Sequence, residues 1–169
     1  ALSNNTALIG SSGDDDHGRD SGSAYLFDTT TGSLLQKFTA PDGSASDYFG
    51  SSVALRNNTA LIASRGDHDN GTNSGSAYLF DTVTGSLLQK FTAPDGSADD
   101  WFGYSVALSD NTALIGSIRD DDSGSDSGSA HLFAINPQPT PEPSSDPKSV
   151  PEPSSLLGIV GTFAIAVLS

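Results

Sequence analysis

The sequence predicts an all-β fold built from β-propeller blades, and three observations lead to that prediction. A unit recurs every 53 residues, since Ala1, Ala54 and Ala107 occupy equivalent places, and repeats of roughly this size are typical of propellers and solenoids. Each unit divides into short apolar runs separated by turn residues. The 169 residues include 18 glycines and few long helix formers, which favours strands and turns.

The first half of a unit predicts a β-hairpin. Ser51 to Leu55 alternates small or polar residues with apolar ones, as a half-buried strand does. Thr59 to Ala63 is a continuous apolar run, as expected for a strand buried on both faces. Between them lies Asn57-Asn58, and asparagine tolerates the positive φ of a two-residue hairpin turn.

The second half of a unit predicts two further strands. Ser76 to Asp81 is a third strand, and Thr82 to Gly85 forms the turn that follows it. Leu87 to Thr92 is more polar, so we expect an outer edge strand on which Lys90 discourages edge-to-edge pairing. The turn Ala93 to Gly96 then leads to the next unit. Four antiparallel strands make one propeller blade.

The predicted domain boundaries follow from the repeat. Residues 1–134 hold three such four-stranded units in an incomplete ring: a partial blade at 1–48, a blade at 49–101 and a third at 102–134 that lacks the fourth strand. Residues 135–149 form a proline-rich linker. Residues 150–169 include a thirteen-residue apolar run, Leu156 to Leu168, whereas a full bilayer span needs about 20 residues.

Composition limits the function. The formal net charge is −14, and so acidic a surface repels nucleic acid and anionic membranes while it attracts cations. Cysteine is absent, which excludes disulfides and thiolate chemistry. A catalytic histidine needs a partnered nucleophile or acid, and none is evident here. Asp47, and Asp99 with Asp100, could form a carboxylate pair for glycoside chemistry, but their place before the Phe-Gly step favours a turn or strand-entry role.

The strongest chemical candidate is the acidic loop between the second and third strands of each unit. Calcium takes six to eight oxygen ligands, which alternate carboxylates around a glycine turn can supply in part. The alternative is a solvated turn in which Asp, Asn and Gly serve backbone geometry. The candidate calcium ligands are Asp14, Asp16 and Asp20, then Asp67, Asp69 and Asn73, then Asp120, Asp122 and Asp126.

Three further features have a structural and a functional interpretation. Arg65-Gly66-Asp67 matches a cell-attachment tripeptide, but the other units do not repeat it, which favours a chance match. His131 replaces Tyr25 and Tyr78 on a strand, and we expect a packed ring rather than a catalytic base. Trp101 stands where the previous unit has a tyrosine, and we expect packing rather than a sugar platform.

The blades resemble FG-GAP repeats, which build the integrin α-chain propeller and occur in many bacterial surface proteins. The resemblance rests on Phe49-Gly50 and Phe102-Gly103 before the first strand, and on the strands from Gly75 to Phe80 and from Gly128 to Phe133. It implies a propeller that closes with about seven blades. The family's calcium loop between the first two strands is shortened here to residues 57–58 and 110–111.

The C-terminal segment resembles a PEP-CTERM sorting signal of exported bacterial proteins. A short motif stands directly before the apolar run, and its residues are Val150, Pro151, Glu152, Pro153 and Ser154. The resemblance implies recognition by an exosortase, followed by release or attachment at the cell surface. The alternative is an ordinary membrane anchor behind a proline-rich stalk.

Together these features predict an exported propeller protein of the cell surface, outer envelope or extracellular matrix. Its role would be non-enzymatic binding or adhesion, with a polysaccharide or protein as ligand and with the C-terminal segment in the membrane during processing. One alternative is the non-catalytic C-terminal part of a secreted propeller hydrolase or lyase. Another is a structural matrix protein without a specific ligand.

Overall fold

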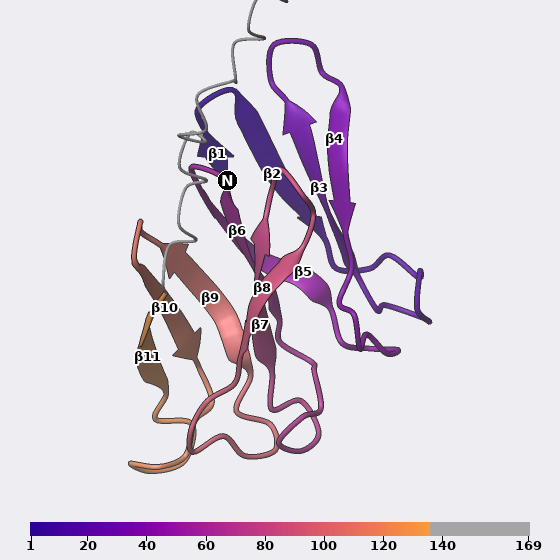
Figure 1. The fold of residues 1–169 in the computed structure, drawn as a ribbon. Helices are drawn as coiled ribbons and strands as arrows, with labels where there is room; N and C mark the ends of the chain where they lie inside the picture. The colour runs from indigo at the N-terminus through magenta and orange to yellow at the C-terminus, as the bar shows by residue number, and fades with distance from the viewer. Residues whose placement is uncertain (136–169) are drawn as a thin grey trace, which may run out of the picture. The chain divides into compact units, whose positions relative to one another are not determined.

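The computed structural model describes residues 1–135, in which eleven β-strands and no helix occur (Figure 1). The strands make two four-stranded sheets and one three-stranded sheet, each antiparallel with consecutive strands as neighbours. These sheets are blades 1, 2 and 3. Their strands are β1 (Leu2–Ser3), β2 (Thr6–Ser11), β3 (Ser23–Asp28) and β4 (Leu34–Phe38); β5 (Phe49–Arg56), β6 (Thr59–Ser64), β7 (Ser76–Asp81) and β8 (Leu87–Phe91); and β9 (Phe102–Leu108), β10 (Thr112–Ser117) and β11 (Ser129–Ala134).

The turns form as the sequence predicts. Asn57 follows β5 with φ 50°, in the left-handed region that a tight hairpin turn requires. After β7, the Asp81 carboxylate accepts hydrogen bonds from the backbone N–H groups of Val83 and Thr84, both at 2.8 Å. These bonds stabilise the charged form and hold the pKa of Asp81 below its usual value.

The first strands of blades 2 and 3 include the Phe-Gly step that the sequence placed before them. β5 begins at Phe49 rather than Ser51, and its register against β6 shifts between Phe49 and Val53. The Phe-Gly step therefore lies inside the sheet, where Phe49 and Phe102 are fully buried. The alternating pattern missed this extension because a bulge interrupts the two-residue period.

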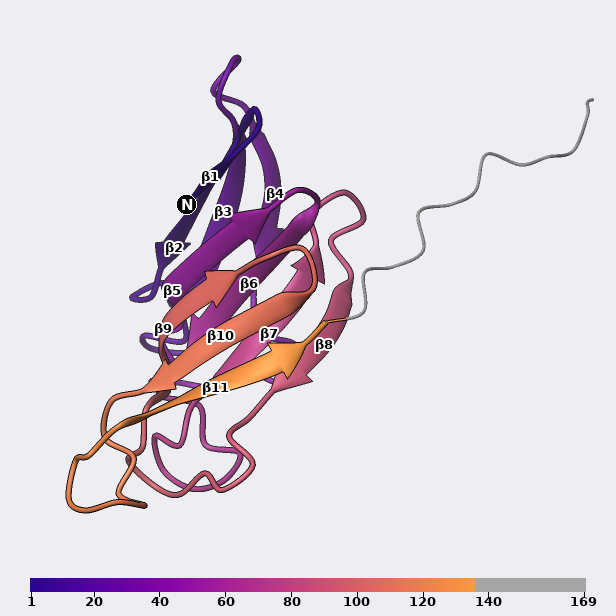
Figure 2. The same ribbon diagram turned by 90° about the vertical axis from the view of Figure 1, so that its left-hand side faces the viewer.

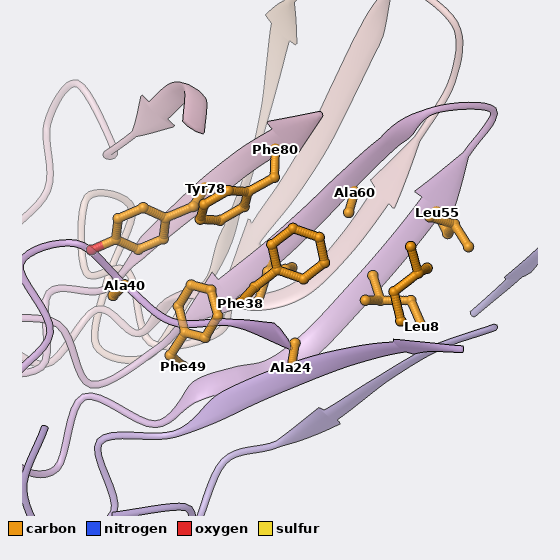
Figure 3. Packing of buried hydrophobic residues seen from close by; sticks show 11 residues of the cluster. Leu8, Ala24, Phe38, Ala40, Phe49, Leu55, Ala60, Tyr78 and Phe80 are labelled. Carbon is orange, nitrogen blue, oxygen red and sulfur yellow. The ribbon is translucent and has the colours of Figure 1, made fainter. Parts of the chain in front are cut away.

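The hydrophobic core lies between blades and not within them. Blade 1 contributes Leu8 and Leu26 to a cluster whose other side is a group of blade 2 rings, Phe49, Tyr78 and Phe80 (Figure 3). Phe49 meets Tyr78 edge-on with ring centroids 5.5 Å apart. A favourable aromatic contact of this kind adds about 0.5–1.5 kcal/mol to the burial term.

A second cluster joins blades 2 and 3 in the same way. Leu61 and Leu79 of blade 2 face Phe102 and Ile115 of blade 3, and β9 and β10 lie over β6 and β7 in the view of Figure 2. The side chains of β6 alternate between the two clusters. This explains why Thr59–Ser64 is buried along almost its whole length, as the continuous apolar run predicts.

The arrangement of blades is open at both ends. Leu114 and Leu132 of blade 3 occupy the positions of Leu61 and Leu79, yet they are 45% and 70% exposed, against 0% and 3% for the blade 2 pair. On the opposite end, Ile9 of blade 1 is 56% exposed. Each blade face is therefore apolar by sequence, and a neighbouring blade decides whether it is buried.

Two remaining predictions concern the chain beyond the blades. The proline-rich linker, apart from Ile135 at its edge, and the sorting motif from Val150 to Ser154 lie outside the described residues. Within residues 1–135, no helix is long and apolar enough to cross a membrane.

Candidate cation sites at the acidic loop end

The longest loops gather at one end of the blades. The loops between the second and third strands and the connections between consecutive blades must share this end, because antiparallel strands reverse direction at each turn. Figure 1 shows those of blades 2 and 3 together at the lower end of the view. We call this surface the acidic loop end, and it comprises residues 12–22, 39–48, 65–75, 92–101 and 118–128.

In blade 2 a lysine ammonium lies among three carboxylates. Lys90 Nζ is 2.6 Å from Asp42 and 3.3 Å from Asp67, and it also contacts Asp69. Burial alone would lower the pKa of Lys90, but the carboxylates of Asp42 and Asp69 outweigh it and raise the pKa above its usual value. The sequence predicts that Lys90 faces solvent on the edge strand and discourages edge-to-edge pairing. Its side chain instead lies among these carboxylates.

A tyrosine completes this site from the neighbouring strand. Tyr78 pairs with Lys90 across β7 and β8, and its hydroxyl lies 2.8 Å from Asp42 and 2.5 Å from Asp67, so it can donate its proton to either. Burial first, and then the two carboxylates, raise the pKa of Tyr78 far above the usual value. The hydroxyl therefore stays protonated as a donor.

Blade 1 repeats the site with one carboxylate fewer. Lys37 Nζ contacts Asp16 and lies 3.7 Å from Asp14, while the Tyr25 hydroxyl donates to Asp14 at 2.5 Å. Hydrogen bonds from Lys37 and Ser23 hold the pKa of Asp16 below its usual value. In both blades the first two members of the predicted calcium set surround an ammonium group.

The third member of each predicted set makes a turn instead. Asp20, Asn73 and Asp126 all adopt positive φ, between 51° and 55°. The Asp20 carboxylate faces Arg19 at 3.3 Å, and the Asn73 amide donates to Asp99 at 2.8 Å. Calcium binding by these loops remains a prediction, and the lysines compete with it in blades 1 and 2.

A cavity of about 410 Å³ lies at the junction of blades 1 and 2. Its lining includes Asp42, Asp67 and Asp69, together with Asp47 and His68. Asp47 is only 3% exposed, and its Oδ1 makes no hydrogen bond, although His68 Nδ1 is 3.3 Å away. Burial, followed by a weaker effect of the neighbouring Asp67, raises the pKa of Asp47.

Aromatic and guanidinium groups stack beside these carboxylates. The Arg65 guanidinium lies 4.7 Å from the Tyr48 ring and 5.1 Å from the Trp101 ring, and Arg119 covers Trp101 at 4.1 Å. Tyr48 and Trp101 both have positive φ, 56° and 57°, which is unusual for bulky residues. Trp101 is thus a packing residue, as predicted.

The same contacts make Arg65-Gly66-Asp67 unsuitable as a cell-attachment motif. Arg65 lies between two rings, and Asp67 is 5% exposed and hydrogen-bonded by Tyr78. A cell-attachment tripeptide must present both charges to its receptor. Arg65-Gly66-Asp67 does not do so, which agrees with a chance match.

Sequence reasoning missed the residues that connect the blades. Asp42 and Lys90 are 48 residues apart: Asp42 lies in the repeat equivalent of the turn Ala93 to Gly96, and Lys90 lies on the predicted edge strand. The repeat does contain a signal, because Lys90 lies opposite Tyr78 in an antiparallel pairing of these strands, and the acidic loop and this turn share one end of the blade. Combining these two facts places the ammonium near the carboxylates.

The antiparallel sheets pack face to face, and the first strand of each following sheet contacts the sheet before it. This arrangement is that of β-propeller blades. The chain belongs to the FG-GAP repeat family, whose model matches residues 1–27, 33–80 and 86–133. No curated protein matches the sequence.

Two solved structures are similar to the chain. A europium-containing methanol dehydrogenase is 13% identical with a TM-score of 0.52, over 80% of this chain and 22% of that one. Sqt1 of Saccharomyces cerevisiae is also 13% identical, with a TM-score of 0.46 over 76% of this chain and 27% of that one. The chain thus spans about a quarter of either protein. At 13% identity the likeness to the dehydrogenase concerns the fold alone.

Proposed function

We propose that this chain is the partner-binding part of an exported surface protein and that it has no catalytic activity of its own. The observation that carries the proposal is the charge of the acidic loop end. Of the 18 acidic residues in residues 1–134, 15 lie there, and the other three are at the opposite end: Asp28 and Asp81 end strands β3 and β7, and Asp110 lies in the turn between β9 and β10. Such a segregation of charge favours one face for binding.

The proposed partner is a polysaccharide or a protein of the envelope or matrix. Carboxylates accept hydrogen bonds from sugar hydroxyls, and bound cations can bridge them to acidic groups of a partner. Calcium at the predicted loops would strengthen such a contact. A net charge of −14 opposes binding of nucleic acid.

The proposed route to the surface depends on the C-terminal sequence. The motif from Val150 to Ser154, followed by an apolar run, would be recognised by an exosortase-like enzyme. The C-terminal segment would contact the membrane during this processing. The protein would then remain at the cell surface or outer envelope, or enter the extracellular matrix.

A pair of matched double variants tests the binding proposal on a glycan and matrix-protein array, read at fixed calcium and salt. Asp15→Asn with Asp121→Asn neutralises two exposed carboxylates of the acidic loop end, and Asp28→Asn with Asp81→Asn makes the same charge change at the opposite end. All four side chains accept backbone N–H bonds that asparagine can keep. We expect binding to weaken at least several-fold only in the first variant. Absence of binding by the parent, or equal loss in both variants, would contradict the proposal and favour a structural matrix role.

A further inference from the structure

The position that Lys90 fills in blade 2 has no lysine in blade 3. Lys37 and Lys90 are 53 residues apart, and the next equivalent position in the sequence is Pro143. The carboxylates that surround the ammonium group are nevertheless repeated: Asp95 corresponds to Asp42, and Asp120 and Asp122 correspond to Asp67 and Asp69. The sites of blades 1 and 2 therefore hold a lysine ammonium group, whereas the equivalent site of blade 3 has the carboxylates without the lysine.

The tyrosine of this site is also replaced in blade 3. His131 stands at the position of Tyr25 and Tyr78 on the third strand. Its ring packs against Phe102 with centroids 5.5 Å apart, and its side chain is 14% exposed. A protonated tyrosine hydroxyl adds a hydrogen bond to a carboxylate, whereas a neutral imidazole nitrogen is a common metal ligand.

The geometry of this group suits a metal ion. Ligand atoms of Asp95, Asp120 and His131 all lie within 4.8 Å of one another, and no other group of three acidic or histidine side chains within residues 1–135 does so. In tetrahedral coordination, two ligands at about 2.1 Å from a zinc ion are about 3.4 Å apart. Ligand atoms that lie within 4.8 Å of one another therefore need to approach by at most about 1.4 Å.

The negative charge of the group has no cationic partner among residues 1–135 other than the histidine, whose Nε2 is 3.9 Å from Asp120 Oδ2. Asp122 adds a further carboxylate, and its backbone N–H donates a hydrogen bond to Asp120 Oδ1 at 3.0 Å. Carboxylates gathered in this way repel one another unless a proton or a cation lies between them.

A neighbouring hydroxyl orients the most buried ligand. Ser129 Oγ donates to Asp120 Oδ2 at 2.6 Å and lies 2.9 Å from His131 Nε2. Hydrogen bonds of this kind fix the orientation of metal ligands and tune their basicity. Asp120 is 3% exposed, so the ion would be held at the base of the loop and not at its tip.

We propose that Asp95, Asp120, Asp122 and His131 bind a divalent transition-metal ion, with Zn²⁺ as the best match, in the place that a lysine ammonium occupies in blades 1 and 2. A mixed set of imidazole and carboxylate ligands suits zinc, whereas calcium takes oxygen alone. The ion would join the turn after β8 to the loop and third strand of blade 3. This site differs from the predicted calcium loop, since it uses Asp95 and His131 and leaves out Asp126, and it does not depend on the proposed partner binding.

Thermal unfolding of the full chain in Zn²⁺, in Ca²⁺ and in chelator tests the proposal. We expect Zn²⁺ at a hundredfold excess over its dissociation constant to raise the melting temperature by several degrees, because a ligand of the folded state stabilises it by mass action. The variant His131→Tyr restores the residue of blades 1 and 2. It should melt near the parent in chelator and lose most of the rise in Zn²⁺.

The variant Asp95→Asn provides a second measurement, because residue 95 lies in an exposed turn where an amide is tolerated. It should also lose most of the rise. The proposal is overturned if the parent shows no rise in Zn²⁺, or if His131→Tyr and Asp95→Asn retain the parent's full rise. Calcium should leave the His131 and Asp95 variants no different from the parent, and a calcium effect abolished by His131→Tyr would contradict the zinc assignment.

Discussion

The substitution Gly22→Ala should weaken the packing of blade 1 against blade 2 and lower the free energy of unfolding. Gly22 has φ +85° and forms a bridge with Phe49, and the N–H of Phe49 donates to the carbonyl of Ser21 at 2.9 Å. A Cβ atom at position 22 would lie 2.1 Å from the Phe49 carbonyl oxygen, where ordinary contact begins at 3.4 Å. Backbone lies on both sides of this contact, so a side-chain rotation cannot relieve it.

Gly32→Ala in the same blade is the matched control. Gly32 has a similar φ of +73°, but an added Cβ would meet nothing within 4 Å. Both variants carry the left-handed penalty of about 1–2 kcal/mol, offset by about 0.4–1 kcal/mol from the stiffer unfolded chain. Gly22→Ala adds an overpacking cost of about 1–3 kcal/mol and weakens a hydrogen bond that contributes about 1 kcal/mol.

We therefore expect Gly22→Ala to lower the free energy of unfolding by about 2–4 kcal/mol more than Gly32→Ala does. Urea unfolding followed by far-ultraviolet circular dichroism measures both, and the fluorescence of Trp101, the single tryptophan, provides an independent probe of the next junction. Equal losses in the two variants would refute the reasoning, because Gly22 would then be required only for its positive φ and not for its close contact with Phe49.

Two further predictions concern the charges between blades 1 and 2. Lys90→Met should lower the unfolding free energy by about 1–3 kcal/mol, more than Lys37→Met, because Lys90 is less exposed and balances three carboxylates rather than two; equal losses in urea unfolding would argue against this account. Asp47 has a raised pKa in the folded state, so the folded chain binds this proton more tightly than the unfolded chain. Stability from this group is therefore lost as pH rises from about 4 through its folded pKa, and Asp47→Asn should flatten that part of the pH profile; an unchanged profile would show that Asp47 is not its source.

The local structure follows from short-range sequence patterns. Alternation, apolar runs and the Asn57-Asn58 turn predict strands that the structure contains, because the pleat and the turn conformations depend on neighbouring residues. The start of β5 at Phe49 was missed because a bulge breaks the period. The positive φ of Tyr48 and Trp101 was missed because no aromatic residue favours it, and packing against the neighbouring blade imposes it.

The candidate sites depend on distances that the sequence pattern does not contain. The acidic loops and their alternating carboxylates are visible in the sequence, but Asp42 and Asp95 reach them only because each turn packs against the following blade. Lys90 appeared to be an exposed edge residue because edge strands normally face solvent. Its side chain is instead 21% exposed and lies over the Tyr78 ring, 4.9 Å from the ring centroid.

The near-identity of blades 1 and 2 separates the effect of sequence from that of position. Residues 22–45 and 75–98 differ only at Thr30 and Val83, yet Tyr78 is fully buried with two carboxylate partners while Tyr25 is half-buried with one. The second carboxylate partner of Tyr78, Asp42, comes from the preceding blade. Blade 3 has such a neighbour, so position does not explain why its site lacks a lysine and carries His131. That change lies in the sequence, and it converts a site closed by its own ammonium group into one that can take an ion from solution.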